Sequence, residues 1–296
     1  VIQGLYYGIQ MQGDKYIEWK FNYETRKEIA ITNWAAGVTD IEQLTVSDLI
    51  SNATPESEVE FLTTVRQWDQ EASYLRMKNQ IGTNWMQLAD SDIVYLNGHE
   101  YWIAPLTFDY GTISTSFINQ RLIYTHTEGI VVLDAYSGDI VEDDALVALF
   151  NRTEPVTMYY GEDTGFRGSV FPNVPSVQEI GNNSFQGTPD YELKGFESFY
   201  YMLTQGPEAW SFLGQEMDIL IERNVLSRVQ NVLLQGLRVD NDPYIVVAPD
   251  GTLSYAVSIY VDYRLATAYA HERYMRFMGV ARVDIENGDI EFYSQP

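Results

Sequence analysis

The strongest constraint on the fold is a repeat within the chain. At a separation of 150 residues, segments 121–140 and 271–290 share six identical residues, where about one is expected by chance. In the first copy these are Tyr124, Gly129, Asp134, Gly138, Asp139 and Ile140. At a separation of 153 residues, Gly98, Asp109 and Tyr110 match Gly251, Asp262 and Tyr263. The shared order of these positions predicts an internal duplication.

Turn-forming residues recur at equivalent places in both copies. Asn97-Gly98 and Asp250-Gly251 each separate two β-prone runs, which is the strongest short-range signal for a β-hairpin. Gly138 and Gly288 mark a second hairpin turn in each copy, and in the first copy this hairpin is expected to begin at residue 121. The pattern predicts an α+β fold of two similar helix-plus-antiparallel-hairpin units around an irregular middle segment.

Helical signals lie around these hairpins. Asp69 is a suitable N-cap for a helix that ends near Ile81. Apolar spacing predicts helices over 196–203 and 209–237, and a strand followed by a helix over 16–36. The Gly-rich and Pro-rich stretch 166–190 is expected to be irregular.

These signals divide the chain into four segments. They are an N-terminal strand and helix segment (1–56), a first α+β unit (57–143), an irregular middle (144–206) and a second α+β unit (207–296). Apolar runs such as 130–133 are far shorter than the roughly 20 residues that a membrane helix needs, so we expect no span within these residues.

Charge and composition exclude several classes of function. The 42 acidic and 18 basic residues give a formal net charge of −24, which repels nucleic acid. The absence of cysteine excludes disulfides, a thiol nucleophile and thiolate metal sites. Two acidic clusters, at 142–144 and 240–242, offer oxygen ligands, but neither continues into a calcium-binding loop. We therefore predict neither a metal nor another cofactor.

Two short segments supply the candidate site residues. Strand periodicity would place Tyr124, His126 and Glu128 on one face, where Glu128 could orient the imidazole. Tyr160 and Glu162 could present a carboxylate opposite another acid, as glycoside hydrolysis requires. No nucleophile motif accompanies them. We take the five residues as a candidate binding cluster and assign no catalytic residue.

Several segments, taken in order, resemble the uncharacterised protein family UPF0182, and the resemblance covers nearly the whole chain. The most specific are 119–126, which ends in Tyr124-Thr125-His126, and 159–162, which reads Tyr-Tyr-Gly-Glu. The other segments are Tyr16-Ile17 with Thr25-Arg26, Leu44-Thr45 with Asp48-Leu49, 66–69, 242–247 and 283–293. Two segments depart from the family pattern. Thr127-Glu128-Gly129 stands where the family has Gly-Tyr-Gly, and 192–199 replaces a glycine-rich stretch.

The resemblance implies a membrane-anchored protein whose spanning helices precede Val1, with this part on the extracytoplasmic side. It implies no known activity. The leading hypothesis is therefore binding or assembly at the cell surface, with the transmembrane portion of the same polypeptide and a cell-surface molecule as partners. The alternative is an extracytoplasmic hydrolase that uses carboxylates on glycans or peptides. A single cleft lined by His126, Glu128, Tyr160 and Glu162 would favour the hydrolase.

Overall fold

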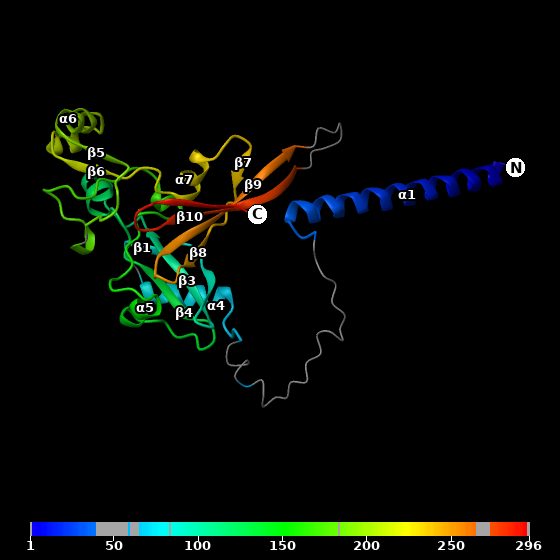
Figure 1. The fold of residues 1–296 in the computed structure, drawn as a ribbon, viewed down its shortest axis with the longest axis horizontal. Coiled ribbons are helices and arrows are strands. Elements are labelled where there is room, and N and C mark those ends of the chain that lie inside the picture. Colours follow the sequence, from blue (N-terminus) through cyan, green and yellow to red (C-terminus); the bar gives the residue numbers. More distant parts are fainter. Residues whose placement is uncertain are drawn as a thin grey trace. The chain divides into compact units, whose positions relative to one another are not determined.

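The computed structural model describes residues 2–39, 59, 65–82, 84–182, 184–264 and 273–294 (Figure 1). Helices and antiparallel sheets together make an α+β fold, as predicted. The chain forms two compact units. Unit 1 comprises Val1–Ser51, Leu234–Arg238 and Ile259–Met278, and unit 2 comprises Asn52–Leu233, Val239–Ser258 and Gly279–Pro296.

Unit 1 contains the helix α1, Ile2–Ala36, which corrects the prediction of a strand followed by a helix over 16–36. Apolar and polar residues alternate in this segment, as they would on a strand, but its aromatic side chains contact one another at helical spacing. Trp19 lies 6.2 Å from Tyr16 and 5.7 Å from Tyr23, measured between ring centroids. Aromatic residues three and four positions apart meet on a helix and not on a strand, so these pairs favour the helix.

Unit 2 holds the other helices that the structure describes. They are α4 Gln70–Ile81, α5 Asp143–Leu149, α6 Gly195–Thr204 and α7 Val225–Val232, with the π-helix η1 Asn119–Ile123 and the 3-10 helices η2 Thr164–Phe166, η3 Ile180–Asn182 and η4 Pro207–Phe212. The predicted cap is confirmed, because the Asp69 carboxylate accepts a hydrogen bond from Ala72 N at 2.8 Å. The helix predicted over 196–203 is confirmed as α6.

Within the described residues, the strands form three antiparallel sheets. The first contains β1 Met86–Leu88, β3 His99–Phe108 and β2 Asp92–Leu96 in that order, with β4 Ile130–Asp134 also paired to β3. The second has the order β11 Ile290–Ser294, β10 Arg273–Asp284, β9 Leu253–Arg264 and β7 Leu237–Val239, with β8 Tyr244–Val247 also paired to β9. β5 Tyr191–Leu193 pairs with β6 Met217–Ile219.

Two predicted elements differ in the structure. Segment 209–237 is broken into η4, β6, α7 and the start of β7 because Gly214 and Glu222 take positive φ angles of 73° and 45°, which end a helix. In the hairpin predicted from residue 121, only β4 and one bridge between Leu133 and Ile140 have strand pairing, and the preceding segment is the π-helix η1.

The hairpins at Gly98 and Gly251 are confirmed, but their turns are not equivalent. Asn97 and Gly98 have φ angles of 52° and 83° and link directly paired strand ends, which defines a two-residue type I′ turn. Gly251 N donates to the carbonyl of Ala248, and Ala248 N donates to the carbonyl of Thr252. The second hairpin therefore has a three-residue loop, one residue longer than the first.

The second turn in each half, closed by Gly138 or by Gly288, has the same hydrogen bonds. Asp134 Oδ1 accepts from two backbone N–H groups of its own turn at 2.8 Å, and Asp284 Oδ1 does the same at 2.8 and 3.0 Å. Gly138 and Gly288 close these turns with φ angles of 77° and 76°. The turns that follow Asp134 and Asp284 therefore share the same backbone conformation and hydrogen bonds.

Each of these turn glycines also lies beneath an aromatic ring. A Cβ at Gly138 would overlap the ring of Trp68, and a Cβ at Gly288 would overlap that of Tyr160. Arg76 Nε donates to the carbonyl of the first glycine at 2.5 Å, and Arg228 Nε donates to that of the second at 2.7 Å. The internal duplication stays a prediction: these paired contacts agree with it, whereas the different loop lengths at Gly98 and Gly251 count against it.

Two apolar clusters in unit 2 hold the elements in place. Met77 of α4 packs on Leu88, Trp102, Ala104, Leu106, Val131, Leu133 and Ala135 from the first sheet and its turn. A second cluster joins Leu122, Phe171, Val174, Leu193, Met202, Ala209, Phe212, Met217 and Ile219. This second cluster fixes the loop after Phe171, which forms the cavity described below.

No helix in the described ranges is long and apolar enough to cross a bilayer.

Candidate functional site

His126 lies at the centre of a buried polar cluster in unit 2. The π-helix η1 ends at Ile123, and the chain bends through the next three residues, so His126 is not on a strand and its side chain is 0% exposed. Its Nδ1 is 3.0 Å from Thr125 Oγ1 and 3.4 Å from the Glu179 carboxylate. Glu179, and not Glu128, is therefore its acidic neighbour.

The Glu179 carboxylate collects donors from three separate segments. Its Oε2 accepts hydrogen bonds from Thr125 Oγ1 and, at 3.1 Å, from the Tyr159 hydroxyl, and its Oε1 accepts from Asn173 N at 3.0 Å. Burial, and then the nearby Glu179 charge, raise the pKa of Tyr159 far above its usual value. Tyr159 therefore stays protonated and remains a donor.

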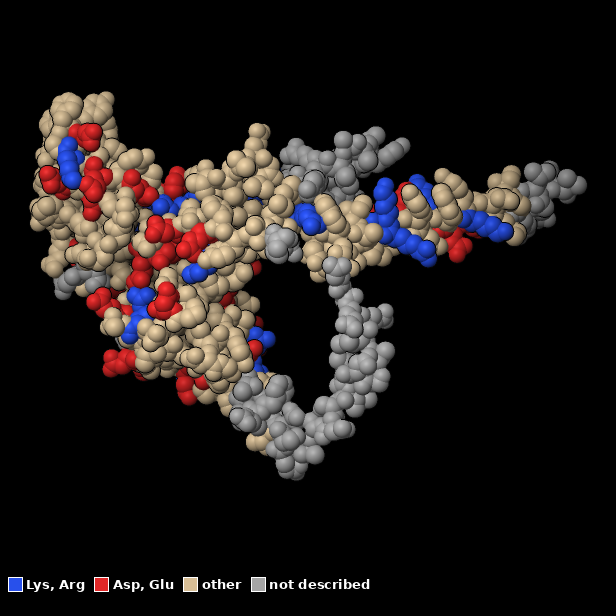
Figure 2. All heavy atoms as spheres, in the orientation of Figure 1, with Lys and Arg blue, Asp and Glu red and all other residues tan. Residues whose placement is uncertain are grey.

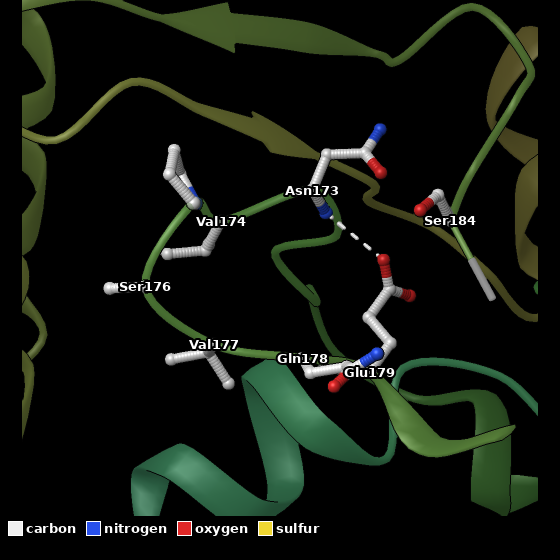
Figure 3. A pocket seen from close by; sticks show the side chains of 8 residues that line it. Asn173, Val174, Ser176, Val177, Gln178, Glu179 and Ser184 are labelled. Atoms are coloured by element: carbon white, nitrogen blue, oxygen red, sulfur yellow. Dashed lines mark hydrogen bonds between the residues drawn. The ribbon is translucent and has the colours of Figure 1, made fainter. Parts of the chain in front are cut away.

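A solvent-open cavity of about 520 Å³ lies beside this carboxylate (Figure 3). It is lined by Asn173, Val174, Pro175, Ser176, Val177, Gln178, Glu179 and Ser184. Figure 3 shows the loop curving around the space, with the carboxyl group of Glu179 directed toward Asn173 and Ser184 nearby. The cavity therefore presents amide, hydroxyl and carboxylate groups from one loop, a set suited to binding a small polar ligand.

Arg223 is a buried side chain that donates hydrogen bonds to two segments of the cluster. Its side chain is 0% exposed and lies 5.6 and 5.5 Å from the ring centroids of Phe108 and Phe166. Its Nη1 donates to the carbonyls of Thr125 at 2.6 Å and Tyr159 at 3.3 Å. Burial lowers the pKa of Arg223 to about 10, so it is cationic at neutral pH.

Sequence reasoning missed Glu179, Arg223, Thr125 and Tyr159. One signal could have identified Arg223, which follows the largely apolar run 217–221 and precedes Val225 and Leu226. An arginine next to such a run is a candidate for burial with its hydrogen bonds directed to the backbone.

The other predicted cluster residues lie in different surroundings. Glu128 is exposed, and Tyr124 is half-buried with its ring 5.0 Å from that of Trp85. Tyr160 is buried, with Arg228 positioned 4.6 Å above its ring and its hydroxyl 3.5 Å from Asp190. The predicted shared strand face of Tyr124, His126 and Glu128 is wrong, because these residues follow a π-helix in bends and a single bridge.

Glu162 belongs to a second carboxyl group cluster. Its pKa is raised to about 8, chiefly by burial; a hydrogen bond from Asp90 N opposes this rise, and the charges of Asp92 and Asp90 add to it. Burial likewise raises the pKa of Asp92 to about 6, although Ile245 N donates to its carboxylate at 3.0 Å. At neutral pH Glu162 is therefore mainly protonated and Asp92 mainly ionised.

Over the described ranges, no group of three or more His, Asp or Glu side chains is arranged to hold a metal ion.

The fold and the cluster define an α+β domain with a polar loop cavity and a buried His–Glu–Tyr network. The proteins to which this chain is similar in sequence are members of one family. The chain is 28% identical over 282 residues to a UPF0182 protein of Geotalea uraniireducens, covering 85% of this chain and 30% of that protein. It is 28% identical over 233 residues to one from Geobacter sulfurreducens (69% and 25%), and 26% identical over 250 residues to one from Nostoc (69% and 25%).

Over most of its length, the chain is therefore similar to proteins of the UPF0182 family. It spans about a quarter to a third of the length of these relatives. No family model matches it, and no solved structure matches it.

Proposed function

We propose that this chain is an extracytoplasmic domain of a UPF0182 membrane protein and that it acts by binding or assembly at the cell surface. Two observations support the location. The matched relatives extend well beyond the region that the chain covers, which leaves room for membrane-spanning segments. The chain also carries a net charge of −24, which favours solubility and disfavours nucleic acid as a partner.

The burial of His126 carries the preference for binding over catalysis. A general base must come within hydrogen-bond reach of the substrate, but the His126 ring is fully buried between Thr125, Tyr159 and Glu179. Within this network Glu179 lines the open cavity with a side chain that is 3% exposed, and His126 behind it is 0% exposed. Such an arrangement suits a rigid binding loop.

A hydrolase remains the second candidate because of the Asp92 and Glu162 pair. Hydrolysis by two carboxyl groups needs one protonated and one ionised group, and the raised pKa values of about 8 and about 6 supply that combination at neutral pH. A hydrolase would lose its activity on glycans or peptides in a Glu162→Gln variant, whereas a binding domain would keep its partner.

The proposed location can be tested by thiol labelling in the full-length membrane protein. These 296 residues contain no cysteine, so an introduced thiol has no competitor within them. Glu216 is exposed in the loop before β6. We expect Glu216→Cys to react with a membrane-impermeant maleimide on intact cells.

Ala104→Cys provides the matched control, because Ala104 is 0% exposed on β3 and should react only after denaturation. Labelling of Glu216→Cys only after cell lysis would place the domain in the cytoplasm and refute the proposed location.

A further inference from the structure

The outward face of α6 carries a row of large apolar side chains. Phe196, Phe199, Tyr200 and Leu203 are spaced by three and four residues, which places them on one side of a helix. Their exposed fractions are 79%, 42%, 62% and 44%. The rings of Phe196 and Phe199 stack with centroids 6.3 Å apart.

Trp210 extends this row from the neighbouring helix η4. It is 49% exposed, and its indole Nε1 donates to the carbonyl of Leu203 at 3.4 Å. We call the side chains of Phe196, Phe199, Tyr200, Leu203 and Trp210 the aromatic stripe. In Figure 2 the tip at the upper left, where α6 lies, is tan, and acidic and basic side chains border it directly.

The opposite face of the same two helices is fixed in the core. Met202 of α6 and Ala209 and Phe212 of η4 are buried in one apolar cluster, and Ser198 Oγ donates to the carbonyl of Gln215. The aromatic stripe is therefore held outward by a packed inner face. Substitutions within it should leave the fold intact.

The size of the aromatic stripe argues against a protein partner. With about 200 Å² of surface on each aromatic side chain, its exposed area is roughly 500 Å². A stable protein interface buries about 800 Å² on each partner, so the stripe is small for a second copy of the chain or for another protein. A lipid interface can take up a few aromatic side chains without such a minimum.

The composition and charge of the stripe match a bilayer surface. Tyr and Trp concentrate at the lipid–water boundary because each combines an apolar ring with a polar atom. A helix of 10 residues is about 15 Å long, too short to span a bilayer but able to lie flat on it. The flanking charges are mainly acidic, at Glu192, Glu197 and Glu208, and the one basic residue, Lys194, is paired with Glu192 at 2.6 Å. This surround lacks the free cations that an anionic bilayer would attract, so it favours zwitterionic headgroups.

We propose that the aromatic stripe docks α6 and η4 into the lipid–water interface of a zwitterionic bilayer. The proposal rests on the proposed function, because a domain of a membrane protein is held next to a bilayer, where a shallow contact of this size can persist. Docking would set the orientation of unit 2 on the membrane.

Flotation of the 296-residue chain with phosphatidylcholine vesicles tests the proposal. We expect the wild-type chain to float and Trp fluorescence to be quenched by brominated phosphatidylcholine. In the Phe196→Ser/Leu203→Ser variant, the bound fraction should fall roughly tenfold or more, since two exposed apolar side chains no longer enter the interface. Circular dichroism should be unchanged.

Tyr95→Ser/Phe292→Ser is the matched control, because these aromatic side chains are 69% and 55% exposed on β2 and β11. It should float like the wild type. Equal flotation of the stripe variant and the wild type, or no flotation of either, overturns the proposal. So does a wild-type dimer in sedimentation that the stripe variant abolishes, because the stripe would then bind a second copy.

Failure of lipid docking and failure of the proposed location give different results. Flotation uses the isolated chain and is independent of cellular location, whereas thiol labelling of Glu216→Cys reports location without depending on α6. Labelling outside the cell without flotation refutes the docking alone, and flotation with labelling only after lysis refutes the location alone.

Discussion

At the scale of single residues, Glu162 is the side chain whose charge opposes the folded state most clearly. Burial raises its pKa from 4.5 to about 8, so the folded chain favours the protonated form. Between these two values the unfolded chain releases a proton that the folded chain retains. Stability from this group is therefore intact below about pH 4.5, declines as pH rises, and reaches its minimum above about pH 8.

We expect Glu162→Gln to remove this pH dependence, because the amide resembles the protonated carboxyl group. At pH 5 the variant and the wild type should unfold at similar denaturant concentrations. At pH 8.5 the variant should be more stable by about 2–4 kcal/mol, since one pKa unit corresponds to ~1.4 kcal/mol. Urea unfolding at the two pH values measures the difference. Glu128→Gln, at an exposed carboxylate, should change neither curve, and equal curves for the wild type and Glu162→Gln at pH 8.5 would contradict the expectation.

Sequence identified one residue of the buried cluster and assigned it the wrong partner. His126 was singled out beside Glu128 because strand periodicity relates residues two apart. Its actual acidic neighbour, Glu179, lies 3.4 Å away but beyond η2 and an irregular loop. No local period connects these positions, because their contact depends on how the loop after Phe171 packs.

At the scale of elements, the turns at Gly138 and Gly288 allow the free-energy cost of an unfavourable backbone conformation to be compared with the cost of a steric clash. Gly138 and Gly288 have positive φ angles, and a Cβ at either would overlap an aromatic ring. Gly214 has a similar φ of 73° but open space around it. Alanine at Gly214 should cost about 1 kcal/mol for the unfavourable backbone alone. Alanine at either turn glycine should cost about 3 kcal/mol or more, because the ring must also move.

Denaturant unfolding of the three single variants measures these costs. Gly214→Ala is the control for backbone conformation, since it shares the positive φ and lacks the ring. Equal destabilisation of all three variants would show that the rings of Trp68 and Tyr160 yield without cost, contrary to the packing described.

Elements fixed by local chemistry were predicted well. The α4 helix has its N-cap at Asp69, and the hairpin at Asn97-Gly98 needs only the turn and its two strands. Elements that depend on the φ angle of a single residue or on pairing with a distant strand were not predicted well. The segment 209–237 has apolar residues at helical spacing, but the positive φ angles of Gly214 and Glu222 end the helix, and β6 pairs with a distant strand. Periodicity records neither the φ angle of a single residue nor the position of a pairing strand.

At the scale of the whole molecule, the net charge of −24 should weaken the folded state at low salt. The helix α1 carries four basic and four acidic residues, so the excess of negative charge lies elsewhere in the chain. Figure 2 shows acidic side chains gathered over the face of unit 2 that it presents. Salt shortens the range of their repulsion to about 10 Å at 0.1 M.

We expect the melting temperature to rise by roughly 3 °C or more between 20 and 200 mM NaCl, because screening reduces repulsion in the folded state. Differential scanning calorimetry measures the change. KCl at equal ionic strength should give the same rise, since screening does not distinguish the two cations. A constant or falling melting temperature would show that the acidic groups are neutralised by local contacts.

The paired glycine turns also bear on how the sequence can vary. Each turn admits one residue type for the same two reasons, a positive φ and a ring where a Cβ would lie. The clash caused by a side chain at Gly138 or Gly288 is relieved by a smaller side chain at Trp68 or Tyr160, respectively, while the cost of the positive φ remains. Trp68 and Tyr160 lie in different segments, so a compensating substitution beside one glycine does not relieve the clash at the other. The two turns therefore drift independently, each as a coupled glycine and aromatic pair, however similar their backbones remain.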